Sequence, residues 1–282
     1  MGNALFIVWR ESLEAVLVIG ILHAFLKRMP DMYAAMKYLW SGILGGVSFS
    51  LLVIFAAFQI QGYLQGETLE AFRTGVILFA VGLITQMVLW MNKHGRHMKQ
   101  NLETGVSRAL AKSGLIGIAL VAALAVAREG TETVIFMYSL GAGKESGEIW
   151  QLIVGGLLGL VLALAMAWAV SRGIRRINYR TFFRLSGIIL LFLAASLLVT
   201  GVNRLIAMGW LPALVEPVWD TSWLLDDASL LGHMVSGFTG YRAQPSLMLI
   251  LAYIGYWAPT LWWLALQNKK ALGIESKSTT GG

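Results

Sequence analysis

Seven stretches of predominantly apolar residues, each long enough to cross a bilayer, are separated by polar segments along the chain. About 20 apolar residues in a helix span the hydrocarbon core, so the pattern predicts an all-α polytopic membrane protein. The first stretch lacks the basic start and the cleavage site of a signal peptide, so we interpret it as a retained span. The predicted spans are approximately Ala4–Leu26, Leu39–Ile60, Leu69–Met91, Leu115–Leu140, Leu152–Ser171, Leu185–Met208 and Ser246–Gln267.

Basic residues outside the spans predict the orientation of the helices. Sixteen of them lie at the C-terminus or in the loops that follow spans one, three and five, and only three lie on the opposite side. Because basic loops are retained in the cytoplasm, we expect the N-terminus outside and the C-terminus inside. The sixteen are Lys27, Arg28, Lys37, Lys93, Arg96, Lys99, Arg108, Lys112, Arg172, Arg175, Arg176, Arg180, Arg184, Lys269, Lys270 and Lys277, and the three are Lys144, Arg204 and Arg242.

Two related pentapeptides interrupt the apolar pattern, RESLE at Arg10–Glu14 and REGTE at Arg128–Glu132. Each places an arginine and two glutamates inside a span, where an unpaired charge costs about 2.5–3.5 kcal/mol on the insertion scale. Intramembrane charges of this kind are usually functional. The two spans are predicted to run in opposite directions, which indicates an inverted repeat of three plus three helices with a seventh helix added.

The repeat defines the predicted domain organisation. A single transmembrane domain covers residues 1–271, with repeat halves at about 1–91 and 109–208 and the seventh helix at about 246–267. Residues 272–282 are rich in Ser, Thr and Gly and are predicted to form a disordered tail. The longest connection, at about 209–245, is predicted to lie outside and to form a short interfacial helix or a lid.

Composition narrows the classes of function. The chain is 57% hydrophobic and 13% charged, whereas soluble domains have about 25% charged residues. The net charge of +7 comes from basic loops, so we expect a lipid bilayer and not nucleic acid as the partner. The chain contains no cysteine, which excludes disulfides, zinc–thiolate sites and thiol redox chemistry.

The pentapeptides have the chemistry of a site for a hard cation. Residues three or four apart share a helix face, so each arginine can pair with the second glutamate of its own motif. Facing each other, the two turns would offer four carboxylates, and oxygen ligands suit hard cations. The predicted metal ligands are Glu11, Glu14, Glu129 and Glu132, with Arg10 and Arg128 as their partners.

Small and hydroxylated residues complete the predicted site. Ser12 and Thr131 would add hydroxyl groups, and Gly130 would allow a neighbouring helix to approach closely. Four carboxylates and two guanidinium groups carry a net charge of −2, which would balance a divalent cation and leaves the valence of the metal open. Two alternatives are ion pairs that only tie the helices together and a relay for protons.

Three further groups of polar residues are weaker candidates. The first would form a funnel that admits the cation, the second would capture it outside, and the third would receive it on exit. The alternatives are a solvated helix end, a helix cap or solvated loop, and an ordinary cytoplasmic loop. The groups are Glu67 and Glu70 at the outer start of span three, Asp226 and Asp227 in the long outer connection, and Met91, His94, His97 and Met98 at the inner end of span three.

On these residues the chain resembles the oxidase-dependent iron transporters, the high-affinity iron permeases, and among them the bacterial EfeU type. The hallmark of that family is an Arg-Glu-x-x-Glu motif in the first and fourth of seven helices, which corresponds to the two pentapeptides here. The flanks RESLEAVLVIGIL and REGTETVIFMYSL and the stretch WDTSWLLDDASLLGHMVSGFTGYRAQPS, Trp219 to Ser246, are also similar. Ser12 stands where the family commonly has glycine.

The resemblance implies an iron permease of the inner membrane, with the motif glutamates as iron ligands. It implies that ferric iron is carried into the cytoplasm after oxidation by an extracytoplasmic partner, and that iron is a transported substrate and no cofactor is permanently bound. The alternatives are a permease for another cation, such as lead or manganese, an intramembrane enzyme, or a structural membrane subunit. The enzyme is disfavoured because the chain has no H-E-x-x-H, no G-x-S-x-G and no cysteine.

Overall fold

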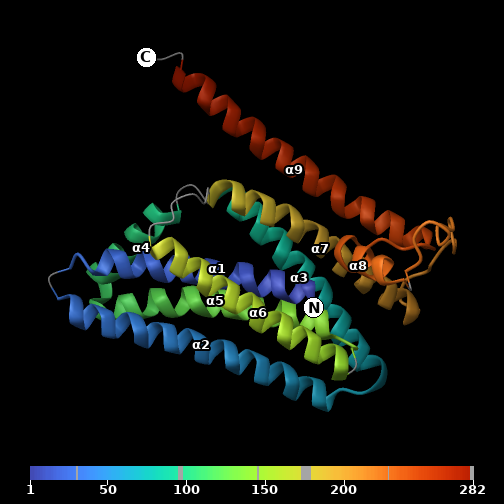
Figure 1. The fold of residues 1–282 in the computed structure, drawn as a ribbon, viewed down its shortest axis with the longest axis horizontal. Helices are drawn as coiled ribbons and strands as arrows, with labels where there is room; N and C mark the ends of the chain where they lie inside the picture. The colour runs from blue at the N-terminus through green and yellow to red at the C-terminus, as the bar shows by residue number, and fades with distance from the viewer. Residues whose placement is uncertain (30, 95–97, 145, 173–178, 228, 280–282) are drawn as a thin grey trace. The chain divides into compact units, whose positions relative to one another are not determined.

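The computed structural model describes the whole chain except residues 30, 95–97, 145, 173–178, 228 and 280–282. Within the described residues the regular structure is entirely helical (Figure 1). The helices are α1 (Gly2–Leu26), α2 (Met32–Tyr63), α3 (Gly66–His94), α4 (Met98–Ser113), α5 (Leu115–Gly141), α6 (Ser146–Ser171), α7 (Tyr179–Ala207), α8 (Leu230–Thr239) and α9 (Leu247–Thr279).

Each predicted span coincides with a long helix, although not every one is apolar enough to count as a span on composition alone. Helices α2, α3, α6, α7 and α9 each contain a segment that is long and apolar enough to cross a membrane. The other two long helices, α1 and α5, each carry the three charged residues of a pentapeptide. The chain is therefore a multi-pass membrane protein.

Two helices lie in segments that were predicted as connections. Helix α4, Met98–Ser113, occupies most of the segment interpreted as an ordinary inner loop, so that interpretation is wrong for its secondary structure. The cause is a short amphipathic pattern, since Val106 is fully buried and Leu102 and Leu110 pack beside it. Helix α8 confirms the short helix predicted in the outer connection. Helix α9 continues to Thr279 and so includes part of the segment predicted to be disordered.

The chain divides into two compact units, and the pentapeptides lie together in the first. This unit comprises residues 1–76 and 96–182, and the second comprises residues 77–95 and 183–282. Within the first unit α1 and α5 lie side by side and run in opposite directions, α2 packs along α5, and α6 packs along α1 (Figure 1). The helices that carry the two motifs, α1 and α5, are thereby neighbours within this group of four helices.

Small residues set the close spacing of these helix pairs. A Cβ atom added to Gly46 of α2 would lie 2.7 Å from the Ala123 carbonyl oxygen of α5. A Cβ atom added to Gly155 of α6 would lie 2.6 Å from the Met1 carbonyl oxygen at the start of α1. Close backbone approach through glycine is the usual way in which helices associate in membranes.

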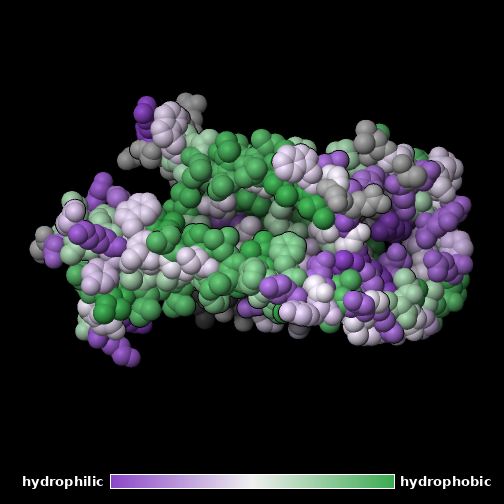
Figure 2. Space-filling view, turned by 90° about the horizontal axis from the view of Figure 1, so that it is seen from below, coloured by the Kyte–Doolittle hydropathy of each residue, from purple (hydrophilic) through white to green (hydrophobic). Residues whose placement is uncertain are grey.

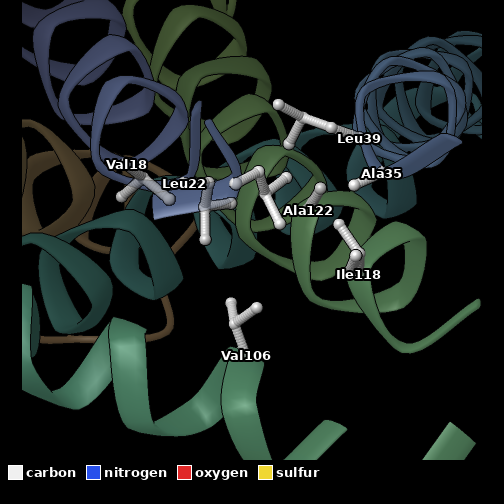
Figure 3. Packing of buried hydrophobic residues seen from close by; sticks show 8 residues of the cluster. Val18, Leu22, Ala35, Leu39, Val106, Ile118 and Ala122 are labelled. Carbon is white, nitrogen blue, oxygen red and sulfur yellow. The ribbon is translucent and has the colours of Figure 1, made fainter. Parts of the chain in front are cut away.

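A buried apolar cluster closes the end of this unit away from the motifs. It joins α1, α2, α4 and α5, and Figure 3 shows side chains from all four helices converging. Its members are Val18, Leu22, Leu26, Ala35, Leu39, Val106, Ile118 and Ala122. Close packing of side chains is a main source of helix association in membranes, so the cluster helps to hold the two motif helices together.

The second unit consists of the remainder of α3 with α7, α8 and α9. Val199 and Val202 of α7 pack against Leu249 of α9. The Thr85 hydroxyl of α3 lies 3.2 Å from the Tyr256 hydroxyl of α9. These contacts make it a separate helical body.

Exposed side chains of the long helices are largely apolar, as a lipid-facing surface requires. On α2, Leu44, Leu52 and Phe55 are among many large hydrophobic residues that are well exposed. Figure 2 shows hydrophobic side chains spread over much of one face of the molecule.

Candidate metal site

The first motif is a fully buried ion-pair cluster within α1. Arg10 has no exposed surface and the Glu11 side chain is only 1% exposed. The guanidinium Nη1 lies 3.0 Å from Glu11 Oε1, and Nη2 lies 2.7 Å from Glu14 Oε1. The predicted pairing of Arg10 with Glu14 along one helix face is therefore confirmed.

The second motif repeats this pairing within α5 in a more open setting. Arg128 Nε lies 2.9 Å from Glu132 Oε1 and 3.8 Å from Glu129 Oε1. The Arg128 side chain is 44% exposed, whereas that of Glu129 is 9% exposed. The same residue types at the same spacing thus have two different surroundings.

Three of the four predicted ligands come together between the two antiparallel helices. Carboxylate oxygens of Glu11, Glu129 and Glu132 lie within 4.8 Å of one another. A hard cation with metal–oxygen distances of about 2.3–2.6 Å can contact oxygens that far apart. Glu14 is outside this group, and its carboxylate pairs with Arg10.

Several oxygens of this cluster lack a hydrogen-bond partner. Oε2 of Glu11, Glu129 and Glu132 is buried, and none of the three has a partner among the described residues. A buried carboxylate without a partner is costly, and a bound cation would supply the missing interaction. The arrangement therefore has the electrostatic requirements of a cation site.

A cavity of about 230 Å³ adjoins the carboxylates and is lined by α1, α2 and α5. Glu11 and Ser12 reach it from α1, and Glu129 and Gly130 from α5. Thr131 does not line it, and its buried hydroxyl has no hydrogen-bond partner in the described part of the chain. The full lining is Glu11, Ser12, Ala15, Val47, Ser50, Leu51, Ile54, Val126, Glu129, Gly130, Thr133 and Val134.

Two hydroxyl groups in this lining were missed by the sequence analysis. Ser50 belongs to α2 and Thr133 follows the second motif on α5. A Cβ atom on Gly130 would collide with the Ser50 side chain, so the predicted close approach at Gly130 is confirmed and α2 is the approaching helix. The sequence contains a pattern that predicts such a contact, because small residues recur at every fourth position of α2. These residues are Gly42, Gly46 and Ser50.

The two glutamates of the predicted outer funnel lie in the first two turns of α3. Glu67 is exposed near the start of α3, and the Glu70 carboxylate pairs with Arg73 at 2.8 Å. The Tyr138 hydroxyl of α5 donates a hydrogen bond to Gln61 Oε1 at 2.6 Å. A polar group is therefore present at this end of the first unit, about two turns beyond Glu132 on α5.

The aspartates of the outer connection take part in folding that segment. Asp227 accepts a hydrogen bond from the Ala243 amide at 3.1 Å, and the Asp226 carbonyl accepts one from the Ser229 hydroxyl at 2.7 Å. Nearby, hydrogen bonds from the Ser222 hydroxyl and amide and from Gln244 hold the pKa of Asp220 below its usual value. These contacts are those expected of a folded loop with a capped helix.

The predicted exit cluster is described only at Met91, which is buried. His97, and the side chains of His94 and Met98, lie outside the described residues.

Buried acidic groups among apolar membrane helices are typical of proteins that carry cations across a membrane. The family model of the iron permease FTR1 family matches residues 1–279, so the chain belongs to this family. It is 32% identical over 257 residues to the ferrous iron permease EfeU of Escherichia coli O6:K15:H31 (strain 536), covering 90% of this chain and 92% of that protein. It is 30% identical to the ferrous iron permease EfeU of Yersinia pestis, covering 90% of each. No solved structure matches the chain.

Membership of this family makes the protein an iron transporter of the membrane and not an enzyme, with iron as its transported substrate.

Proposed function

We propose that the protein carries iron across the inner membrane into the cytoplasm, with Glu11, Glu129 and Glu132 as the ligands that the ion contacts on its way. The supporting observation is that these three carboxylates come together within 4.8 Å although they belong to two different helices. Glu14 is not one of these ligands, and its role is to make an ion pair with Arg10 beside the site. Iron occupies the site as a substrate in transit, and no cofactor is permanently bound.

The transmembrane core is an inverted repeat of three plus three helices, with α1, α2 and α3 in one half, α5, α6 and α7 in the other, and α9 as the seventh span. Matching helix contacts support this. Gly46 of α2 would meet Ala123 and Ala127 of α5, and Gly159 of α6 would meet Leu5 and Trp9 of α1. Ala123 lies 118 positions after Leu5, and Ala127 lies 118 positions after Trp9. This is the same separation as that between Arg10 and Arg128.

The contact of α2 with α5 and the contact of α6 with α1 are called the glycine seams. Each glycine seam has a second glycine, and the partners of these two glycines show the same offset. Gly42 would meet Ala119 and Ala122, and Gly155 would meet Met1 and Ala4, again 118 positions apart. Equivalent contacts at four positions support a two-fold relation between the α1–α6 and α5–α2 pairs. Because α1 and α5 are antiparallel, that relation places the two motifs at a common depth.

The N-terminus lies outside and the C-terminus inside. The distribution of sixteen basic residues on one side and three on the other supports this orientation. Leu224 in the outer connection and Ser107 on α4 are both exposed and the chain has no native cysteine. In intact cells a membrane-impermeant thiol reagent should label Leu224→Cys and spare Ser107→Cys, and the reverse pattern would overturn the orientation.

The ion is ferric when it reaches the site, after oxidation by an extracytoplasmic partner protein. The cavity offers carboxylate and hydroxyl oxygens and none of its lining residues carries sulfur or imidazole, which suits a hard ion. A divalent cation such as ferrous iron or manganese is the second candidate, because the two motifs together carry a net charge of −2. The relatives reported above are named for ferrous iron.

Uptake into proteoliposomes, with ferrous iron under anaerobic conditions and ferric citrate in separate experiments, tests this proposal. We expect uptake of ferric iron by the wild type and its loss in Glu129→Gln, while Glu148→Gln, in the first turn of α6, retains it. Uptake of ferrous iron alone would exclude the ferric form, and full activity of Glu129→Gln would exclude the site.

A further inference from the structure

We propose that the hydroxyl oxygens of Ser50 and Thr133 contact the cation directly and complete its coordination beside Glu11 and Glu129. This inference rests on the proposed function and adds ligands from α2 and α5 to that site. All four residues line one cavity.

Ser50 is placed in the cavity by the glycine of the second motif. Its hydroxyl occupies the space that a side chain at position 130 would fill, so Gly130 makes room for it. Ser50 is buried and its hydroxyl donates a hydrogen bond to the Gly46 carbonyl at 3.0 Å. The serine is therefore fixed in position by its own helix.

The two hydroxyls have the same electrostatic character. Thr133 donates its hydrogen bond to the Glu129 carbonyl at 2.8 Å, one turn back on α5. A hydroxyl has one hydrogen and two lone pairs, so each of these groups has used its hydrogen on the helix backbone. What each offers to the cavity is lone pairs alone, which attract a cation and cannot donate to the carboxylates.

The carboxylates show why additional oxygens are needed. Glu11 Oε2 and Glu129 Oε2 are buried and have no hydrogen-bond partner among the described residues, and both glutamates line the cavity. Hard cations such as calcium take six to eight oxygen ligands. Neutral hydroxyl oxygens raise the number of ligands without adding to the charge of −2, so they favour binding without trapping the ion.

The hydroxyls come from one half of the repeat only. Gly46 of α2 and Gly159 of α6 make equivalent contacts, so the residues four positions after them, Ser50 and Ala163, also correspond. Thr133 of α5 corresponds to Ala15 of α1. The other half of the repeat therefore has alanine at both positions. Replacing Ser50 or Thr133 by alanine gives each position the residue that already packs at the equivalent position of the other half.

The experiment compares Ser50→Ala, Thr133→Ala and the double variant in the full-length protein. Binding of ferric citrate and of anaerobic ferrous iron to the detergent-solubilised protein is measured by calorimetry. We expect each single variant to raise the Kd for the transported form about threefold to tenfold, and the double variant to raise it further. The matched control is Thr200→Val, since Thr200 of α7 makes the same backbone bond at 3.0 Å to Ser196 outside the first unit.

A second pair of variants separates the hydroxyl from the space it fills. Gly130→Ala should displace the Ser50 hydroxyl and weaken binding as Ser50→Ala does. In the Gly130→Ala/Ser50→Gly double variant the collision is relieved but the hydroxyl is absent, so binding should stay weak while the melting temperature recovers. Wild-type affinity in this double variant, or in Ser50→Ala/Thr133→Ala, would overturn the inference.

A Glu11→Gln variant shows whether a negative result refutes only the hydroxyl ligands or the proposed iron site as a whole. Lost binding in Glu11→Gln with full binding in the hydroxyl variants would refute only the hydroxyl ligands. Full binding in Glu11→Gln would refute the site itself.

Discussion

The two pentapeptides have the same spacing of charges and different degrees of burial. Arg10 of α1 is completely buried, whereas Arg128 of α5 is 44% exposed. Both make an ion pair with the glutamate four residues on, at 2.7 and 2.9 Å. A motif that is repeated in sequence can therefore have a structural role in one copy and an adjustable role in the other.

The physical reason lies in the cost of leaving a charge unpaired. Removing one partner of a buried ion pair strands the other charge in a low dielectric, and this penalty is smaller where the pair is less deeply buried. Glu11 and Glu14 both face Arg10 in the closed setting of α1. The four predictions that follow test this contrast and the helix contacts that hold the two motifs together.

Arg10→Ala should destabilise the protein more than Arg128→Ala does. We expect a loss of about 3–5 kcal/mol for Arg10→Ala, because a buried ion pair is broken, and a smaller loss for Arg128→Ala. Thermal unfolding of both variants in the same detergent measures the difference. Equal losses would show that exposure does not distinguish the motifs.

Glu132→Gln should weaken iron binding more than Glu14→Gln does, although the two residues occupy the same position in their motifs. Glu132 belongs to the group of oxygens within 4.8 Å, and Glu14 does not. We expect a rise in Kd of at least about tenfold for Glu132→Gln, as for loss of a charged ligand. Calorimetric titration with iron gives both values, and a larger effect at Glu14 would contradict the assignment of ligands.

Gly46→Ala and Gly159→Ala should destabilise the protein to a similar extent, because both seams are closed by the same contacts. The added methyl of the first would lie 2.7 Å from the Ala123 carbonyl, and that of the second would lie 2.9 Å from the Trp9 amide and closer still to the Leu5 carbonyl. Overpacking of this kind costs about 1–3 kcal/mol. Gly20→Ala is the matched control, since nothing lies within 4 Å of its added methyl. A loss at only one seam would argue against the repeat.

Arg128→Lys should retain partial iron uptake, whereas Arg128→Ala should lose it. Lysine keeps the positive charge but lacks the planar fork that can engage both Glu129 and Glu132. Uptake into proteoliposomes at matched protein levels measures the two variants. Uptake by Arg128→Ala at or above the wild-type rate would show that attraction alone governs the site and that the arginine is scaffold.

Sequence reasoning succeeded where the determining interactions are local. The pairs Arg10–Glu14 and Arg128–Glu132 follow from helical spacing within one turn, and the all-helical structure follows from long apolar runs. Helix α4 was missed because its segment is polar overall and buries only a narrow stripe that includes Val106.

The rest of the site depends on contacts between distant segments. That Glu132 joins Glu11 and Glu129 while Glu14 does not is decided by how α1 and α5 cross. Ser50 could not be assigned to the cavity before α2 was seen to pack on Gly130. Helical periodicity shows which face a residue occupies but not which helix covers that face.

The most direct test of iron binding between α1 and α5 is the amount of iron held at equilibrium by two matched double variants. Glu11→Gln/Glu129→Gln removes two charges inside the site, and Glu67→Gln/Glu70→Gln removes two near the start of α3. After dialysis against iron, metal analysis should find iron in the wild type and in the second variant, and almost none in the first. Iron retained by the first variant at the wild-type level would contradict the account.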